Sequence, residues 1–446
     1  MTFAPTIGLI AEYNPFHNGH VYQLAKLREL HPDAAIVVIM SGSFTQRGGA
    51  AIADKWTRAA WAVRGGADLV LELPYAFACR SAEHFASGGV QCLAGLGCID
   101  ALAFGAEAEH IEPLEKAAAC MDDAALQEAL HARIAGGASY AAAMATEVAA
   151  RTGVAAEVLR APNNILGMEY LRAVRRFAPE METLLVQRVG TDYHDTDMHG
   201  RFASASAIRA ALEGIYGEMP STAQSSLSHA LPSPLLPSAS LTAPSEREPY
   251  IALQRVMPED CLAALMAALP DRLPRQSFLL RPLLSRLLLD AASLSAVCGM
   301  GEGLEHRLME KAQMARSFEG LVGAMATRRY PRSRIARLLV HVLTGFTAEA
   351  AAAFDATGPR YLRVLAMNAR GARLLHRAKK TARLPIITKT SQFLKSKDML
   401  RTWEDLTPLQ QMLLFDVRAT ELREMAVPER GRAGADFRTS PLYVKQ

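Results

Sequence analysis

The stretch that decides the fold follows a short apolar run at residues 6–11 and reads Glu12-Tyr13-Asn14-Pro15-Phe16-His17-Asn18-Gly19-His20. The apolar run predicts a buried parallel strand, and the Asn-Pro pair after it predicts a turn. His17-Asn18-Gly19-His20 then opens a helix, where unpaired N–H groups and the positive end of the helix dipole favour a phosphate. Gly19 allows the backbone to approach a nucleoside closely. The pattern therefore predicts a nucleotide site directly after the first strand.

Strand-length apolar runs alternate with helical patterns through the first half of the chain. We expect strands at 6–12, 35–40, 68–73, 101–104 and 183–189, and helices near 19–30, 54–65, 82–94, 109–121 and 164–177. This alternation predicts an α/β fold with a Rossmann-like, doubly wound parallel sheet. Ligands of such sheets bind beyond the carboxyl ends of the strands, where residues 13–20, 41–47 and 105–107 would lie.

The second half of the chain has a different pattern. Residues 217–249 are rich in Ser, Pro and Leu, which predicts an irregular linker or a surface insertion. Beyond it we expect helices at 259–268, 279–289, 304–327, 332–344, 348–354 and 359–380, and one short strand at 386–388. Because 446 residues are many for one core, we expect a catalytic domain at 1–216, a linker at 217–249 and a mainly α-helical domain at 250–446.

Charge separates the same two halves. Residues 1–249 contain 18 Lys and Arg against 27 Asp and Glu, a net charge of −9, whereas residues 250–446 contain 31 against 18, a net charge of +13. An acidic part beside a basic part is typical of a small-molecule catalytic domain joined to a polyanion-binding domain. The reason is that phosphate neutralisation supplies most of the affinity for nucleic acid.

Composition limits the remaining classes of protein. A hydrophobic content of 50% and a charged content of 21% are typical of a globular chain. The N-terminus has no signal-peptide pattern and no uncharged apolar run reaches membrane-spanning length, so we expect a cytoplasmic protein with no membrane contact and no obligate protein partner. The six cysteines lack zinc-site spacing and predict reduced thiols in or near the core.

Further strings accompany the opening motif, at residues 40–48, 54–59, 104–107, 161–167, 187–188, 193–195 and 202–209. Together with residues 12–20 they resemble the bacterial tRNA(Met) cytidine acetate ligase family, part of the nucleotidyltransferase superfamily that carries a His-x-Gly-His motif. The resemblance is dense over the first half of the chain. It implies an enzyme that activates acetate with ATP to acetyl-adenylate, with Mg²⁺ balancing the phosphates. The acetyl group would then pass to N4 of the wobble cytidine (C34) of elongator tRNA(Met).

His17 and His20 are the predicted catalytic residues. They lie three residues apart at a helix start and therefore share one face. Attack of a carboxylate on the α-phosphate of ATP develops negative charge, which imidazole N–H donors would stabilise. The alternatives are two histidines without a chemical role and a zinc site, which lacks a third ligand at useful spacing. The segment predicted to bind ATP comprises Ile10, Ala11, Glu12, Tyr13, Asn14, Pro15, Phe16, His17, Asn18, Gly19 and His20.

The family resemblance assigns a glycine, an asparagine and an arginine outside this segment to ATP. In this chain the matching residues are Gly105, one of Asn163 and Asn164, and Arg188. Residue spacing alone gives them no chemistry, and the two asparagines would otherwise be interpreted as a helix cap. Which of the two contacts ATP stays open at this point.

Residues 202–209 stand where the superfamily has a second phosphate-binding motif, Ile-Ser-Ser/Thr-x-x-Arg. This chain departs from it at Ala203 and Ala205. Ser206 and Arg209 are nevertheless predicted ATP contacts, because a hydroxyl at a helix start and an arginine one turn later can both donate to phosphate. The alternative for Ser206 is an ordinary N-cap. Lys55, at the start of another expected helix, either reaches phosphate or is solvated.

Two basic runs in the second half predict an RNA-binding surface. Residues 328–337 hold five arginines and residues 360–383 hold eight Lys and Arg, and neither run contains an acid. Such runs are often no more than a solvated face, but two without acidic partners and with interleaved aromatic residues favour contact with RNA. The predicted tRNA-binding residues are Arg328, Arg329, Arg332, Arg334, Arg337, Arg370, Arg373, Arg377, Lys379 and Lys380.

Two other functions compete with this interpretation. A small-molecule adenylyltransferase of the pantetheine-phosphate or nicotinamide-mononucleotide type would share the first motif but would not need a long basic helical domain. A non-catalytic RNA-binding protein could keep a relic nucleotide fold, although the presence of both histidines and Arg209 disfavours it.

Overall fold

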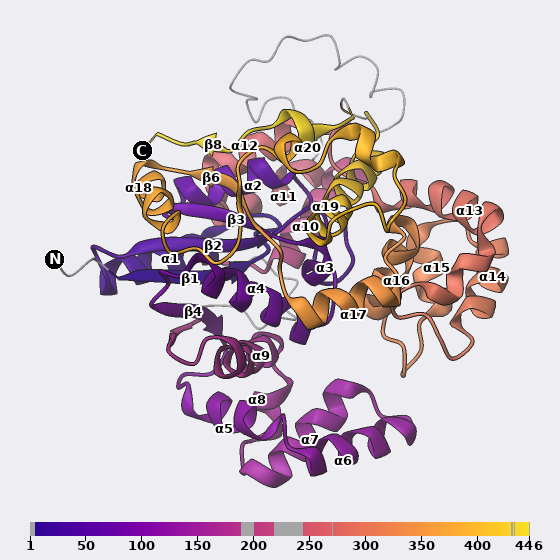
Figure 1. The fold of residues 1–446 in the computed structure, drawn as a ribbon, viewed down its shortest axis with the longest axis horizontal. Coiled ribbons are helices and arrows are strands. Elements are labelled where there is room, and N and C mark those ends of the chain that lie inside the picture. The colour runs from indigo at the N-terminus through magenta and orange to yellow at the C-terminus, as the bar shows by residue number, and fades with distance from the viewer. Residues whose placement is uncertain are drawn as a thin grey trace.

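The computed structural model describes residues 5–188, 200–217, 244–269, 271–429, 431 and 433–445. Its centre is a sheet whose described strands follow the order β5-β4-β1-β2-β3-β6-β7, and β8 pairs with β6 (Figure 1). The strands are β1 (Thr6–Ala11), β2 (Ala35–Ser41), β3 (Leu69–Leu73), β4 (Ala101–Ala106), β5 (Glu182–Gln187), β6 (Leu362–Met367), β7 (Ile386–Ile387) and β8 (Leu442–Tyr443).

The first five strands are parallel, as the alternating pattern predicts. β2 and β3 extend the sheet to one side of β1, and β4 and β5 extend it to the other. The chain therefore reverses its winding between β1 and β4, which is where ligands of open α/β sheets bind. The helices expected in this half begin and end within three residues of the predicted bounds: α1 (Asn18–Leu30), α2 (Lys55–Arg64), α4 (Ala82–Leu96), α5 (Glu112–Cys120) and α9 (Pro162–Phe177).

The expectation of one helix across residues 359–380 is wrong. Leu362–Met367 forms β6, which pairs antiparallel with β3, and only Ala369–Ala378 is helical, as α18. Residues 362–366 are all buried. A strand covered on both faces reads as a continuous apolar run, which periodicity cannot distinguish from a buried helix. The basic half of the chain thus completes the sheet that the acidic half begins.

Two other predicted segments differ in extent. The helix expected at 304–327 is two helices, α14 (Leu304–Met314) and α15 (Phe318–Met325), because Ser317 caps the second by accepting a hydrogen bond from the Gly320 N–H. The expected linker at 217–249 overlaps α11 (Pro244–Val256), and its residues 218–243 lie outside the described residues, as do residues 193–195 of the motif strings. The remaining helices include α3 (Tyr75–Ala78), α6 (Ala124–Ala135), α7 (Tyr140–Thr152), α8 (Ala156–Arg160), α10 (Ala205–Gly217), α12 (Glu259–Ala267), α13 (Leu280–Leu289), α16 (Arg332–Thr344), α17 (Ala348–Thr357), α19 (Pro408–Met425) and α20 (Ala435–Arg438).

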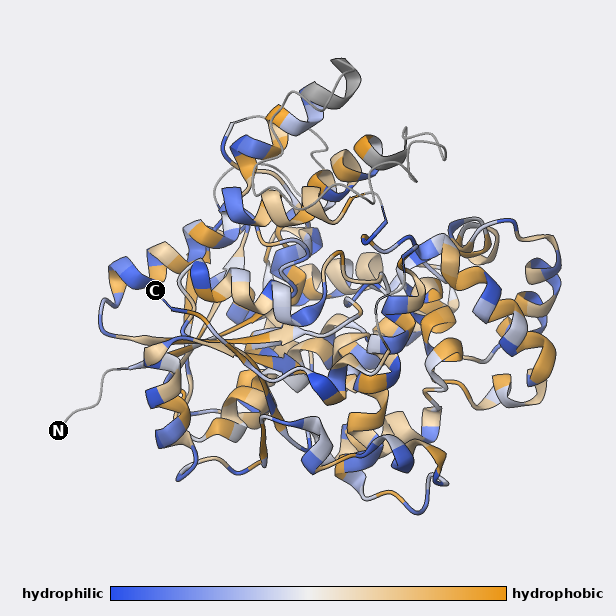
Figure 2. Cartoon of the chain, turned by 90° about the horizontal axis from the view of Figure 1, so that it is seen from above, coloured by the Kyte–Doolittle hydropathy of each residue, from blue (hydrophilic) through white to orange (hydrophobic). Residues whose placement is uncertain are grey.

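Two apolar cores lie on opposite faces of the sheet. One contains residues of α4, α9, α16 and α19, and the other contains residues of α1, α2, α10 and α12. Figure 2 shows hydrophilic and hydrophobic residues alternating along the helices that cover the sheet. The six cysteines are unpaired thiols, of which three are buried. Among the described helices, none combines the length and the apolar character that a membrane crossing requires.

Candidate nucleotide-binding site

The His17-Asn18-Gly19-His20 motif caps α1 with both of its imidazoles. His17 is the N-cap, and its Nδ1 accepts a hydrogen bond from the Gly19 N–H at 3.1 Å. The His20 Nδ1 accepts one in return from the His17 N–H at 3.2 Å. The rings stack with 3.7 Å between their centroids and an interplanar angle of 29°. Two free N–H groups of the helix start are thus satisfied by side chains whose other ring nitrogens remain available.

Electrostatics keep both rings neutral. Loss of hydration, followed by the charges of Arg188 and Arg209, lowers the pKa of His17 to about 3. Loss of hydration, followed by His17 and Arg188, lowers the pKa of His20 well below its ordinary value. A neutral imidazole whose Nδ1 accepts a hydrogen bond must carry its proton on Nε2. Both histidines are therefore inferred to offer an Nε2–H donor at this site.

Arginines from two other segments surround the same histidines. Arg188 follows β5 directly, and its N–H donates to the Ala106 carbonyl at the end of β4. Arg209, on α10, donates from Nη1 to the Asn14 carbonyl at 2.6 Å and from Nη2 to the Ser206 hydroxyl at 3.1 Å. The structure therefore brings residues from after β1, β4 and β5 and from α10 together at the carboxyl ends of the strands.

Gly105 lies beside Arg188 near the end of β4. A Cβ atom added at Gly105 would lie 3.5 Å from the Cγ of Arg188 and 3.5 Å from the Nε2 of Gln23, which is ordinary contact. The space around Gly105 thus leaves room for a methyl group but for little more. Its position agrees with the predicted site, although packing alone does not require glycine there.

The two adjacent asparagines have different roles. Asn164 is buried, and its Oδ1 accepts hydrogen bonds from the N–H groups of Glu107 and Ala108 at 2.9 and 3.0 Å. Its side-chain N–H donates to the Val158 carbonyl. Asn163 is partly exposed, and its side chain bonds to the carboxylate of Glu107 at 2.6 Å. Asn164 is fully engaged in holding the loop after β4, so Asn163 is the one that can turn to a ligand.

Two buried arginines fix the backbone around the motif. Arg58 donates to the carbonyl oxygens of Glu12 at 2.5 Å and Ser41 at 3.0 Å, and so ties the ends of β1 and β2. Arg423 of α19 donates to the carbonyls of Ala51 and Ile52 at 2.9 and 3.2 Å. The Ile52 N–H in turn donates to the Asn14 side chain at 2.7 Å. Sequence reasoning gave neither arginine a role, because their partners are carbonyl oxygens that no sequence pattern reveals.

The possibility that Lys55 reaches phosphate is ruled out by its surroundings. Lys55 is fully buried, and its Nζ lies 2.7 Å from Glu72 and 2.7 Å from Asp436. The guanidinium of Arg363, on β6, forms ion pairs with the same two carboxylates, Glu72 at 3.0 Å and Asp436 at 2.5 Å. Charges buried this deeply are stable only when they are paired. The solvated alternative is equally wrong, because Lys55 joins the two halves of the chain.

Ser204 and Ser206, two serines near the start of α10, also differ in their roles. The buried Ser204 accepts a hydrogen bond from the Ala207 N–H at 3.0 Å and is an ordinary cap of α10. Ser206 is exposed and bonds to Arg209. Ser206 is therefore the hydroxyl of this pair that lies with the predicted phosphate contacts.

The two basic runs lie at opposite edges of the sheet. Arg337 donates to the Gln46 carbonyl at 3.0 Å, in the loop after the carboxyl end of β2. By contrast Arg370 donates to the Ala34 carbonyl and Arg377 to the Thr6 hydroxyl, both at the amino ends of strands. A strand of this length separates its ends by roughly 17–20 Å. The structure thus brings 328–337 towards the nucleotide motif and does not bring 370–380 there.

Exposure also divides the residues of the two runs. Arg337, Arg370 and Arg377 are partly buried and bond to the chain itself, so each has a structural role. The other predicted RNA contacts are exposed: Arg328, Arg329, Arg332, Arg334, Arg373, Lys379 and Lys380.

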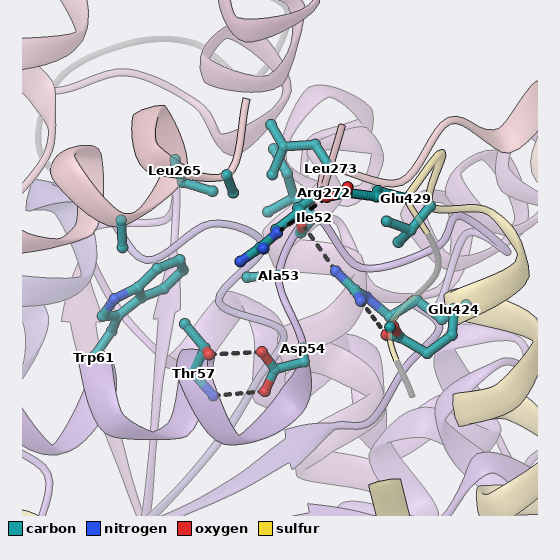
Figure 3. Close-up of a pocket in the computed structure, with 15 residues that line it drawn as sticks. Ile52, Ala53, Asp54, Thr57, Trp61, Leu265, Arg272, Leu273, Glu424 and Glu429 are labelled. Atoms are coloured by element: carbon teal, nitrogen blue, oxygen red, sulfur yellow. Dashed lines mark hydrogen bonds and ion pairs between the residues drawn. The ribbon is translucent and has the colours of Figure 1, made fainter. Parts of the chain in front are cut away.

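A separate cavity of about 700 Å³ lies between α2, α12 and the end of α19. Figure 3 shows its lining, with the Asp54–Thr57 hydrogen bonds on one side and Arg272 and Glu429 on another. It shares Ile52 with the network around Asn14, but none of the predicted ATP-contacting residues lines it. The residues predicted to contact phosphate therefore lie elsewhere, at the carboxyl ends of the strands.

A mainly parallel sheet with His-x-Gly-His opening the first helix at the switch point defines a nucleotide-binding protein of the nucleotidyltransferase type. Comparison with known proteins agrees with this class. Residues 4–435 match the HIGH Nucleotidyl Transferase family. Among solved structures, Thermotoga maritima TmcAL bound with alpha-thio ATP superimposes with a TM-score of 0.79 at 28% identity, covering 99% of this chain and 100% of that one.

Curated relatives narrow the class further. The tRNA(Met) cytidine acetate ligase of Syntrophotalea carbinolica is 36% identical over 98% of this chain and 98% of its own length. That of Acetivibrio thermocellus is 33% identical over 97% of this chain and 98% of its own. The chain therefore belongs to the tRNA(Met) cytidine acetate ligase family, within the HIGH nucleotidyl transferases.

Proposed function

We propose that this chain is an ATP-dependent tRNA ligase that acetylates N4 of the wobble cytidine of elongator tRNA(Met). The observation that carries the proposal is the pair of stacked imidazoles that cap α1 through their Nδ1 atoms, with Arg188 and Arg209 within electrostatic reach of them. Its family supports the same reaction, since relatives that match it over nearly their whole length are tRNA(Met) cytidine acetate ligases.

In the first step, an acetate oxygen attacks the α-phosphorus of ATP. A new O–P bond forms, the bond from that phosphorus to the bridging oxygen breaks, and pyrophosphate leaves. Negative charge grows on the phosphate oxygens, where the Nε2–H donors of His17 and His20 stabilise it most, because they are fixed before the reaction begins. Arg188 and Arg209 add positive charge, and Asn163 is the proposed amide contact.

In the second step, the cytidine N4 attacks the acetyl carbonyl carbon of acetyl-adenylate. AMP leaves with its phosphate oxygen, and the amine loses one proton. The mixed anhydride is already strongly electrophilic, so positioning of the amine supplies most of what this step requires. Within the parts of the chain that the structure describes, none of the groups near His17 stands out as a base.

Mg²⁺ remains a prediction from the family. Among the described residues, no three His, Cys, Asp or Glu side chains come together as a metal site. The described part of the chain therefore offers no protein cage for the ion, which ordinarily binds ATP through phosphate oxygens and water.

The proposed RNA surface is the start of α16 and the loop before it, residues 328–334. These exposed arginines lie at the edge of the sheet that holds the nucleotide motif. Residues 373–380 could reach only a distant part of the tRNA.

A pyrophosphate exchange assay tests the proposal against its rivals. The full chain is incubated with ATP and labelled pyrophosphate, with acetate, with phosphopantetheine or nicotinamide mononucleotide, or with no acceptor. Exchange that requires acetate, followed by acetate label in elongator tRNA(Met), is the expected result. Exchange only with a phosphorylated small molecule would identify an adenylyltransferase, and no exchange under any condition would favour the non-catalytic RNA-binding alternative.

A further inference from the structure

One face of α19, in the basic half of the chain, carries three polar side chains that are buried: Asp416, Thr420 and Arg423. They are spaced four and three residues apart, which places them on the same side of the helix. Buried polar groups are costly unless they form hydrogen bonds. This face of α19 must therefore find its partners in the segments against which it packs.

The first two of these side chains bond to the loops that follow β2 and β3, in the acidic half of the chain. Asp416 accepts a hydrogen bond from the Tyr75 N–H at 2.7 Å, where α3 begins after β3. The Thr420 hydroxyl lies 3.0 Å from that of Ser43, two residues beyond β2. α19 is thus fixed on the carboxyl ends of two parallel strands, the edge at which sheets of this type bind ligands.

Arg423 begins a continuous path of hydrogen bonds from α19 to the nucleotide motif. It donates from Nε to the Ala51 carbonyl at 2.9 Å and from Nη2 to the Ile52 carbonyl at 3.2 Å. The Ile52 N–H donates to the Oδ1 of Asn14 at 2.7 Å. The carbonyl of Asn14 in turn accepts from the Nη1 of Arg209 at 2.6 Å. Arg423, Ile52 and Asn14 are all buried, so water competes little for these bonds.

We propose that Arg423 is a positioning residue of the nucleotide site and that it acts on Arg209, the predicted phosphate contact. The inference rests on the proposed function and adds a residue of the basic half to its ATP site. The guanidinium of Arg423 holds two adjacent carbonyls with two donors in a rigid fork, which a lysine cannot reproduce. Because Asn14 bonds to Ile52 through its side chain and to Arg209 through its carbonyl, a shift of Ile52 displaces the group that orients Arg209.

The test is a double-mutant cycle in the full chain, with the Kd for ATP measured by calorimetry in the absence of acetate and tRNA. The proteins are the unaltered chain, Arg423→Gln, Arg209→Gln and the double variant, and the melting temperature of each is recorded. Arg418→Gln is the matched control. Arg418 lies on the same helix and also donates to a backbone carbonyl, but that carbonyl belongs to Thr344, at the end of α16.

We expect Arg423→Gln to raise the Kd for ATP by about tenfold, within the range shown by residues of one hydrogen-bonded network. In the Arg209→Gln background the same substitution should raise the Kd by less than about twofold, because the group through which Arg423 acts is already absent. Arg423→Lys, which keeps the charge and one donor, should give an intermediate Kd. Arg418→Gln should lower the melting temperature and leave the Kd unchanged.

Three outcomes would overturn the proposal. An equal increase in Kd with and without Arg209 would mean that Arg423 acts by another route. An unchanged Kd in Arg423→Gln, with a lowered melting temperature, would leave Arg423 only a role in stability. An unchanged Kd in Arg209→Gln would remove the contact on which Arg423 is proposed to act.

If Arg423→Gln does not fold, the cycle is run with Arg423→Lys, and the effect of that substitution must likewise disappear in the Arg209→Gln background. The proposed function fails by a different result. An unaltered protein that binds ATP but shows no acetate-dependent exchange would contradict the proposed function, and the cycle on ATP binding would still decide the role of Arg423.

Discussion

His17 and His20 stack ring on ring at the start of α1, and the Nδ1 atom of each accepts a backbone N–H. Each histidine thus has two separable roles, a helix cap through Nδ1 and a donor through Nε2. This geometry allows the cap to be kept while the donor is removed, which a single alanine substitution cannot achieve.

We expect His17→Asn to keep the helix cap, because an asparagine oxygen also accepts from the N-terminal N–H groups. Adenylate formation should nevertheless fall by about 10²-fold or more, the usual effect of removing one preorganised donor from developing charge. His20→Gln, whose side-chain oxygen can accept the N-cap N–H as in a capping box, should show a similar loss in adenylate formation and a much smaller change in ATP affinity. Near-normal exchange in either variant, with the melting temperature retained, would remove that histidine from the mechanism.

Substitution of Asn164 should lower the stability of the fold, whereas substitution of Asn163 should weaken the binding of ATP. Asn164→Ala leaves the N–H groups of Glu107 and Ala108 without their acceptor and should destabilise the fold by about 1–3 kcal/mol. Asn163→Ala should change stability by less than about 0.5 kcal/mol and raise the KM for ATP. Urea unfolding and exchange kinetics on both variants make the comparison. A raised KM for ATP in Asn164→Ala together with an unchanged KM in Asn163→Ala would contradict the proposed contact between Asn163 and ATP.

Arg337 is expected to support the loop at 43–49 more than it contacts RNA, because it is partly buried and donates to the Gln46 carbonyl. Arg337→Gln should therefore slow acetate-dependent exchange in the absence of tRNA by about five- to tenfold, roughly 1–1.4 kcal/mol in the barrier. The salt dependence of tRNA binding by this variant should equal that of the unaltered protein. Arg316→Gln, at an exposed position between α14 and α15, is the matched control. If Arg337→Gln instead lowers the slope of log tRNA affinity against log salt and leaves the exchange rate normal, Arg337 contacts RNA.

Glu169 should make stability depend on pH. Burial, partly offset by Arg172, raises the pKa of its carboxyl from 4.5 to about 7. A raised pKa means that the folded state holds the proton more tightly than the unfolded state. Its stabilising contribution is complete below pH 4.5 and is lost as the pH rises through about 7.

Glu169→Gln should remove this dependence, because glutamine cannot ionise. The free energy of unfolding of the unaltered protein, compared with that of the variant, should fall by up to about 3 kcal/mol between pH 4.5 and 8, at 1.36 kcal/mol for each unit of pKa difference. Urea unfolding at several pH values measures it, and Glu180→Gln, an exposed change of the same charge, is the control. Parallel pH profiles for the unaltered protein and Glu169→Gln would show that the pKa of this carboxyl is the same in the folded and unfolded states, which would contradict the prediction.

Local sequence determined the framework of the nucleotide site. The apolar run at 6–11 and the motif after it specify a strand, a turn and a helix start within fifteen residues, and all of their hydrogen bonds are short in sequence. The alternation of strands and helices likewise predicted the parallel half of the sheet. Such features are readable because each residue's partner lies within one turn or one strand of it.

Tertiary structure decided what depends on partners far along the chain. The interpretation of Lys55 failed because its partners are distant in the sequence: Lys55 and Arg363 neutralise Glu72 and Asp436, which stand in different halves of the chain. Only folding brings those four charges together, and only there does burial force them to pair. The positions of the two basic runs, at opposite ends of the parallel strands, also depend on tertiary structure. The sequence shows that both runs are basic, but the packing of β6 and its neighbouring helices decides at which end of the strands each run lies.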